Sequence, residues 1–314
     1  MKRELVFGNG LLGEAYRAHA SASGHDVHQT SRRPNSDNPN EHFLDLSEDD
    51  SADKVAQLFE DIKPDVVINA AAKLGRNPED NLEQNSLFTR NILEGAKASG
   101  FDFFRIVVIG SSAEYGPLEP SQLPVGEKAQ LNPDSAYGQS KLAETELALK
   151  LADEYELPIV VARLFNLLGS GLHPSNLVSG VINQLKEHES KGLAQIEVRN
   201  LDPMRDYQPV DETVRVIEQL AHAEKLDHRV YNVGSGESIS NEDMIRKILS
   251  YTNYPDMSIV GTNSTPEKIV GSAHADVTRF REEFPDYRQQ YTTDDAIEKI
   301  VKEAGLWHDL RKAA

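Results

Sequence analysis

The hexapeptide Gly8-Asn9-Gly10-Leu11-Leu12-Gly13 constrains the fold of this chain more than any other feature of its sequence. It follows a short β-rich run at 4–7 and precedes a helical stretch at 11–23. Glycines between a strand and a helix permit a tight turn and let the backbone approach a pyrophosphate, which binds at the helix N-terminus. The hexapeptide therefore predicts a dinucleotide-binding unit; the alternative is an ordinary glycine turn in another α/β fold.

Strand-like and helical segments alternate through the first half of the chain. We expect strands at 4–7, 26–30, 42–46, 65–69, 104–110 and 158–164, and helices at 11–23, 51–62, 81–99 and 136–155. The runs 66–68 and 106–109 are continuously apolar, which is typical of strands buried on both faces of a parallel sheet. This alternation predicts an α/β fold with a doubly wound parallel Rossmann sheet.

The pattern is less regular after Phe165. Residues 169–176 are rich in Gly, Ser, Pro and Asn and are expected to form a long loop. Helices are expected at 177–189, 210–223, 241–251 and 294–303, with strands near 195–199 and 229–233 and one more close to the C-terminus. We predict a dinucleotide-binding domain over 1–167 and a smaller α+β substrate lobe over 168–314, with segments near 205–235 returning to the first domain.

Charge and composition disfavour several classes of function. The 51 acidic and 33 basic residues give a net charge of −18, which repels nucleic-acid phosphates, so no nucleic-acid partner is expected. The absence of cysteine excludes disulfides and thiolate metal sites. No apolar run approaches the roughly 20 residues of a membrane span, and no apolar signal segment is visible, so we expect a cytoplasmic protein without a membrane partner.

The ten histidines predict no metal site, because none combines a metal-ligand spacing with an acidic partner in a plausible site. His25 and His28 alternate along an expected strand and are interpreted as surface residues. Since the chain is strongly acidic, an anionic ligand would have to be met by cations placed locally.

Two such cations follow the second expected strand, in the segment Thr30-Ser31-Arg32-Arg33. Dinucleotide folds that prefer NAD usually carry Asp or Glu here, on the ribose 2′-hydroxyl, whereas the first acid after this segment is Asp37. Arginine favours a 2′-phosphate through paired, charge-assisted hydrogen bonds. We therefore predict NADP(H) rather than NAD(H), the alternative being a solvated basic turn.

Tyr137 and Lys141 share one face of an expected helix because they lie four residues apart. An ammonium near a phenol lets the phenol exchange protons closer to neutral pH. Ser111 ends an apolar strand upstream, at the edge where doubly wound folds bind ligands, and could donate a hydrogen bond to a carbonyl oxygen. The alternatives are a helix pair on the surface and a serine that caps a turn.

The order of these motifs resembles the extended short-chain dehydrogenase/reductase family, of the NAD-dependent epimerase/dehydratase type, over nearly the whole chain. The markers are the glycine loop, Asp45, Asn69-Ala70-Ala71-Ala72, Asn85, Ser111, Tyr137 with Lys141, and the segments 163–166, 205–207 and 231–236. The resemblance implies that Ser111, Tyr137 and Lys141 are catalytic and that Lys141 also holds the nicotinamide ribose. It implies cofactor contacts from Gly8, Asn9, Gly10, Leu11, Leu12, Gly13, Ser31, Arg32, Arg33, Asp45, Leu46, Asn69, Ala70, Ala71, Asn85 and Lys141.

Substrate contacts are also implied by the resemblance, from Ser112, Asn166 and Asn176 to a nucleotide-sugar and from Arg205 to its diphosphate. Two alternatives stay open: Arg205 could pair with Asp206 or Asp211, and Asn166 could be a turn residue. The segments 110–116 and 196–207 look like those of GDP-4-keto-6-deoxy-mannose reductases. Family members commonly form homodimers through the helices that here contain 85–98 and 136–155.

Two departures from the family pattern qualify this resemblance. Phe7 stands where the family's loop usually begins with glycine, and Ser112 and Ala113 stand where the dehydratases carry an acidic pair. Without that pair, water elimination lacks its acid and base. We therefore expect an NADPH-dependent reductase of a keto group on a nucleotide-activated 6-deoxysugar. The alternatives are a nucleotide-sugar epimerase that keeps its cofactor bound and a non-catalytic, NADP-sensing Rossmann protein.

Overall fold

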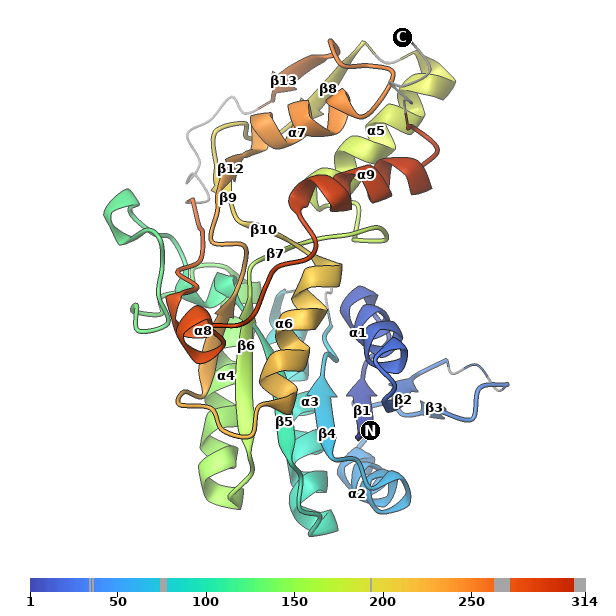
Figure 1. The fold of residues 1–314 in the computed structure, drawn as a ribbon, viewed down its shortest axis with the longest axis vertical. Coiled ribbons are helices and arrows are strands. Elements are labelled where there is room, and N and C mark those ends of the chain that lie inside the picture. Colours follow the sequence, from blue (N-terminus) through green and yellow to red (C-terminus); the bar gives the residue numbers. More distant parts are fainter. Residues whose placement is uncertain (34, 36, 74–77, 193, 263–271, 308–314) are drawn as a thin grey trace.

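A seven-stranded parallel sheet forms the centre of the molecule (Figure 1). The computed structural model describes residues 1–33, 35, 37–73, 78–192, 194–262 and 272–307. The strands lie in the order β11-β6-β5-β4-β1-β2-β3. Their bounds are β1 Arg3–Phe7, β2 Asp26–Ser31, β3 Glu41–Phe43, β4 Val66–Asn69, β5 Arg105–Ser111, β6 Ile159–Leu164 and β11 Val230–Val233. The strand order reverses beside β1, which is the switch point where doubly wound folds bind ligands, and the predicted fold class is confirmed.

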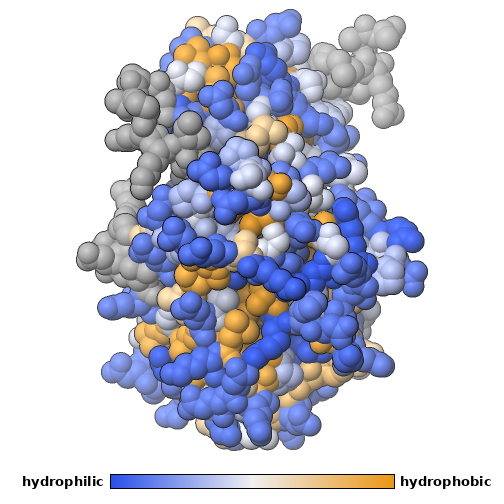
Figure 2. Space-filling view, turned by 90° about the vertical axis from the view of Figure 1, so that its left-hand side faces the viewer, coloured by the Kyte–Doolittle hydropathy of each residue, from blue (hydrophilic) through white to orange (hydrophobic). Residues whose placement is uncertain are grey.

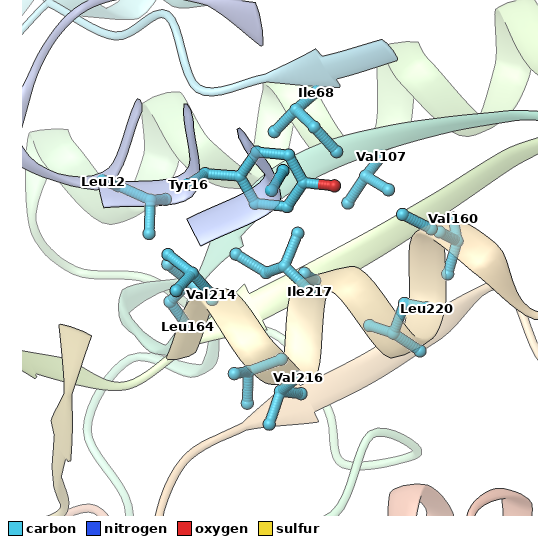
Figure 3. Packing of buried hydrophobic residues seen from close by; sticks show 14 of the residues in the cluster. Leu12, Tyr16, Ile68, Val107, Val160, Leu164, Val214, Val216, Ile217 and Leu220 are labelled. Carbon is cyan, nitrogen blue, oxygen red and sulfur yellow. The ribbon is translucent and has the colours of Figure 1, made fainter. Parts of the chain in front are cut away.

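Helices cover both faces of this sheet (Figure 1). One face carries α1 (Leu11–Ala22) and α6 (Val210–His222), and the other carries α2 (Ser51–Ile62), α3 (Pro78–Ser99) and α4 (Ala136–Tyr155). In α6, apolar residues recur every three or four positions and face the strands. Figure 3 shows Tyr16 of α1 enclosed between Ile217 of α6 and Ile68 of β4.

A second lobe stands at the carboxyl ends of the strands (Figure 1). Its core joins α5 (Leu177–Lys191), α7 (Asn241–Ser250) and α9 (Thr293–Glu303) with β8 (Gln195–Val198), which pairs in parallel with β13 (Ser258–Gly261). The two lobes are joined by the strand pairs β7 (Asn166–Leu168) with β10 (Tyr207–Pro209) and β9 (Met204–Arg205) with β12 (Ile239–Ser240). These pairs, the 3₁₀ helices η1 (Ser112–Tyr115) and η2 (Pro120–Gln122), and α8 (Thr278–Glu283) are too short for sequence periodicity to predict.

The surface interpretation of His25 and His28 is wrong. Each side chain is only 16 % exposed. His25 lies in the turn before β2, where it contacts Glu4 and the ring of His222 from α6. His28 stacks on His42 of the neighbouring strand β3, with Nδ1 of one ring 2.9 Å from Nε2 of the other. Sequence alternation predicted exposure, but a distant helix and a neighbouring strand cover these positions.

Within the described part of the chain, no helix combines the length and apolar character needed to cross a membrane.

Candidate active site

A cavity of about 1060 Å³ opens at the carboxyl edge of the sheet, between the sheet and the second lobe. Its walls come from the glycine loop, the ends of β2, β4 and β5, the first turns of α4, and residues of the second half such as Asn176 and Arg205. The volume slightly exceeds the roughly 300–1,000 Å³ that a single small-molecule site occupies. A dinucleotide and a second ligand can therefore share this space.

The glycine loop is shaped for close approach of the backbone. Gly8 has φ +97°, and a Cβ there would lie 2.9 Å from the carbonyl oxygen of Ala70. A Cβ on Gly13 would lie 2.2 Å from the carbonyl oxygen of Gly8, so the start of α1 packs directly on the loop. A Cβ on Gly10, by contrast, would meet nothing within 4 Å. Gly10 is the N-cap of α1 and offers no side-chain cap, which leaves first-turn N–H groups for an anion.

The end of β2 is tied to this loop by a buried serine. Ser31 Oγ accepts hydrogen bonds from Asn9 Nδ2 at 2.8 Å and from the backbone N–H of Arg33 at 2.9 Å. Arg32 lines the cavity, whereas Arg33 does not and is exposed. Of the two arginines predicted to contact the cofactor, only Arg32 therefore lies in the cavity wall. Asp45 also lines the cavity, and hydrogen bonds from Ser47 together with the charge of Arg32 lower the pKa of its carboxyl group.

Ser111, Tyr137 and Lys141 line the same cavity. Ser111 is the last residue of β5, and Tyr137 and Lys141 lie on successive turns at the start of α4. Ser135 begins α4 as its N-cap and accepts a hydrogen bond from the N–H of Gly138 at 3.0 Å. The phenol of Tyr137 is accessible, since the residue is 37 % exposed, while Lys141 is only 3 % exposed.

A network of buried hydrogen bonds holds the ammonium of Lys141 in place. It donates to the carbonyl oxygen of Ile109 at 2.6 Å and pairs with Glu144 Oε2 at 2.5 Å. The other oxygen of Glu144 accepts from Thr89, whose hydroxyl accepts from Asn69 Nδ2. Burial opposes the charge on Lys141, but attraction to Glu144 and Tyr137 outweighs it and raises the pKa of Lys141. Burial raises the pKa of Glu144, although Lys141 opposes that shift.

Ser111 has a capping role as well as a place in the cavity wall. Its hydroxyl accepts the N–H of Ala113 at 3.2 Å, and its own N–H donates to Glu114 Oε1 at 2.7 Å. Glu114 is fully buried and forms an ion pair with Arg163 of β6 at 2.8 Å. The buried ion pair of Glu114 and Arg163 thus stabilises the turn after β5.

Asn69 and Asn85 were predicted to touch the cofactor, but neither is among the residues that line the cavity. Both are buried and bond to the protein instead. Asn85 Nδ2 donates to Ser140 Oγ at 2.9 Å, and its Oδ1 accepts the N–H of Lys73 at 2.8 Å. Asn69 Oδ1 accepts the N–H of Ala71 at 3.3 Å. They shape the segment after β4, while Ala70 and Ala71 form the cavity wall.

The four residues predicted on the substrate side, Ser112, Asn166, Asn176 and Arg205, all line the cavity. Asn166 donates to the carbonyl oxygen of Asp206 at 3.0 Å, and Asn176 caps α5 by accepting the N–H of Val178 at 3.0 Å. Both therefore also have the local structural roles of turn and cap residues.

The acids suggested as partners of Arg205 are engaged elsewhere. Asp206 accepts backbone hydrogen bonds from Ser235, Gly236 and Ala275, and Asp211 pairs with Lys299 at 2.8 Å. Burial lowers the pKa of the Arg205 guanidinium. A half-buried cation in a cavity wall is suited to an anionic ligand.

Further wall residues were not anticipated, among them Lys73, Phe88, Asp134, Leu172 and Ala273. Lys73 directly follows the tetrapeptide 69–72, and this adjacency could have identified it. Ala273 could not have been found in this way, because it reaches the site through a bridge to Arg205 of β9.

Comparisons with known proteins show which family the chain resembles. Residues 5–234 match the model of the NAD dependent epimerase/dehydratase family. A GDP-6-deoxy-D-mannose reductase of Pseudomonas aeruginosa is 32 % identical over 219 residues, covering 67 % of this chain and 68 % of that protein. A dTDP-6-deoxy-L-talose 4-dehydrogenase (NAD(P)(+)) of Kitasatospora kifunensis is 28 % identical over 254 residues, covering 79 % and 78 %.

The fold has a close match among solved structures. The structure of RMD from Pseudomonas aeruginosa complexed with NADPH superposes with a TM-score of 0.82 at 24 % identity, covering 97 % of this chain and 99 % of that one. The family resemblance predicted from the ordered motifs is confirmed. The chain belongs to the NAD-dependent epimerase/dehydratase family of enzymes.

Proposed function

We propose that this enzyme uses NADPH to reduce a keto group on the sugar of a nucleotide-activated 6-deoxysugar. The observation that carries the proposal is the shared cavity: the glycine loop and Arg32 line one part of it, Tyr137 and Lys141 another, and Arg205 a third. The relatives named for GDP-6-deoxy-D-mannose and dTDP-6-deoxy-L-talose support a 6-deoxysugar linked to a nucleoside diphosphate.

Each residue beside the keto group has a separate role in its reduction. NADPH held by the glycine loop and Arg32 would supply the hydride. Tyr137 donates its phenolic proton to the oxygen of the carbonyl as charge develops there. The Lys141 ammonium stabilises the phenolate that results, because it is fixed near the ring by Glu144 and the carbonyl oxygen of Ile109. The Ser111 hydroxyl, whose oxygen caps η1, keeps its proton for the same substrate oxygen.

Reduction is favoured over dehydration by the turn after β5. Elimination of water needs an acid and a base beside the sugar, and none of the residues that this turn contributes to the cavity wall, Ser112 and Ala113 among them, is acidic. The nearest acid in sequence, Glu114, is fully buried and paired with Arg163. It is therefore shielded from a sugar in the cavity.

The test is NADPH oxidation by the purified protein with GDP- and dTDP-linked 4-keto-6-deoxysugars. Stoichiometric loss of NADPH fluorescence with formation of the 6-deoxyhexose is the expected result. Interconversion of nucleotide-sugar epimers without net NADPH loss would instead establish the epimerase alternative. Binding of NADPH without turnover on either sugar would support a regulator.

Cofactor preference should depend on Arg32 far more than on its neighbour. One charge-assisted hydrogen bond is worth about 1.5–3 kcal/mol, so Arg32→Ala is expected to reduce the preference for NADPH over NADH at least about tenfold. Arg33→Ala is the matched control, because that side chain lies outside the cavity. Fluorescence titration with both cofactors measures the effect. Tighter binding of NADH by the native protein would contradict the proposal.

We also propose a homodimer that buries α3 and α4. These helices pack against each other on one face of the sheet, and Leu87 of α3 is 37 % exposed. Figure 2 shows the side that is on the left in Figure 1, where α4 lies; apolar patches interrupt the hydrophilic surface in its lower half. Light scattering at micromolar concentration should give twice the mass of the chain, and Leu87→Glu should lower it. A monomeric native protein would refute the dimer.

A further inference from the structure

Glu4, His25 and His222 meet at the amino end of the sheet, opposite the glycine loop. They come from β1, from the turn before β2 and from the last turn of α6. One ligand atom of each lies within 4.8 Å of the other two. The Glu4 side chain is fully buried, and the imidazoles are 16 % and 20 % exposed. Two histidines and a carboxylate therefore converge from segments as far as 218 residues apart.

The same oxygen of Glu4 faces both rings. Oε1 lies 3.1 Å from Nδ1 of His25 and 2.9 Å from Nε2 of His222. Nδ1 of His25 also accepts the backbone N–H of Lys2 at 3.3 Å. An amide N–H can only donate, so this contact requires a lone pair on Nδ1. Nδ1 offers only one lone pair, so a metal ion bound between Nδ1 and Glu4 Oε1 would replace this long hydrogen bond from Lys2.

The rings of His25 and His222 also lie close together. Their ring centroids are only 4.6 Å apart, so two imidazolium ions would repel each other. The second oxygen of Glu4 is already satisfied by the hydroxyl of Tyr16 at 2.8 Å. One divalent cation would serve both neutral imidazoles and the carboxylate at once.

The distances suit a transition metal. At metal–ligand distances of about 2.0–2.1 Å, the two Glu4–histidine separations correspond to angles of about 90–100° at the metal. These angles lie between octahedral and tetrahedral geometry. Imidazole nitrogen and carboxylate oxygen are the ligands that Zn²⁺ and its first-row neighbours accept.

Space for further ligands adjoins the cluster. A cavity of about 370 Å³ is lined by His25, Glu218, Gln219, His222, Ala223 and Phe284. Glu218 lies one helical turn before His222 and binds His19 at 2.9 Å. The ammonium of Lys2 lies 3.0 Å from the centre of the Phe104 ring. The cavity leaves room for water ligands, and Glu218 adds a second negative charge.

We propose that Glu4, His25 and His222 form a binding site for one divalent transition-metal ion, with Zn²⁺ as the representative ligand. The ion cross-links β1, the start of β2 and the end of α6, so it acts on stability rather than on the reaction. Glu4 and Gly8 stand at opposite ends of β1, and cofactor binding is therefore independent of the metal.

The test uses native protein without a polyhistidine tag, stripped with a chelator and titrated with Zn²⁺ and Co²⁺. Calorimetry should give one Zn²⁺ per chain, and Co²⁺ should produce ligand-field absorption bands. Zn²⁺ at about 100 times its Kd should raise Tm by roughly 3–6 °C. His25→Asn and His222→Asn should each weaken metal binding by more than the roughly 10–100-fold that loss of an outer-shell partner costs. NADPH affinity should stay unchanged in both variants.

His42→Asn is the matched control, because it removes one ring of the neighbouring His28–His42 pair. It should leave metal affinity unchanged. Failure of the native protein to bind either ion overturns the proposal, and so does binding that His42→Asn abolishes or that survives both ligand variants. If His222→Asn does not fold, metal binding by His25→Asn tests the proposal instead. His25 lies in a turn, so its replacement does not disturb a helix. A Tm that responds to pH but not to metal identifies the cluster as a protonated pair and also overturns the site.

Discussion

Replacing Tyr137 by phenylalanine is expected to lower turnover by about 10²–10⁴-fold while NADPH affinity stays close to that of the native enzyme. The substitution keeps the ring and removes the group that the structure places in the cavity wall beside buried Lys141. A positioned proton donor contributes only when charge develops on the substrate oxygen, so the loss should appear in kcat.

A matched control exists in Tyr291, which is 40 % exposed against 37 % for Tyr137 and lies outside the residues that line the cavity. Tyr291→Phe should keep native turnover. Ser111→Ala should reduce turnover by a smaller factor than Tyr137→Phe, because Ser112 also lines the cavity and can donate a hydrogen bond. Stopped-flow NADPH oxidation separates these variants. Full turnover by Tyr137→Phe would disprove the mechanism, whatever the substrate proves to be.

Lys141→Ala is expected to damage both turnover and the fold. The ammonium of Lys141 pairs with Glu144, and both side chains are almost completely buried. Removing one partner of a buried ion pair leaves an uncompensated charge, which typically lowers the free energy of unfolding by about 3–5 kcal/mol. Turnover should fall at the same time, because the phenol of Tyr137 loses its neighbouring cation. Urea unfolding and NADPH oxidation measure the two effects separately.

The stability loss of Lys141→Ala should depend on pH. Burial raises the pKa of Glu144 in the native protein, and Lys141 opposes that shift, so its removal should raise the pKa further. An acid whose pKa is higher folded than unfolded contributes most to stability below its unfolded value, near 4.3, and loses that contribution as pH rises. The variant should therefore be closer to native stability at about pH 5 than at about pH 8.

The double variant Lys141→Ala/Glu144→Gln separates the two roles of the pair. The neutral amide removes the buried charge and can still accept the hydroxyl of Thr89, so the double variant should recover much of the lost stability. Turnover should remain low, because the cation beside Tyr137 is still absent. Equal stability of Lys141→Ala and native protein at both pH values would show that the pair is not buried in solution.

Local sequence determined the elements of this fold. The glycine hexapeptide, the continuously apolar runs at 66–68 and 106–109 and the spacing of Tyr137 and Lys141 depend on backbone geometry and on residues a few positions apart. For that reason the helices at 51–62 and 136–155 appear at their predicted ends, and the parallel sheet follows from strand–helix alternation. These motifs also predicted that the glycine loop, Tyr137 and Lys141 share one cavity wall, because the carboxyl ends of parallel strands meet at one edge.

The tertiary structure decided which of these residues face the cavity and which support it. Whether Asn85 contacts a ligand or Ser140 depends on how α3 packs against α4. Glu144 pairs with Lys141 in a buried position where Thr89 and the carbonyl oxygen of Ile109 supply the other hydrogen bonds. Likewise, Glu4 and His222 are 218 residues apart and come together only when α6 packs on the sheet. Such contacts follow from burial and long-range packing, which no local pattern encodes. The sequence thus determined the architecture and the position of the candidate site, whereas the packed chain determined the partner of each polar group.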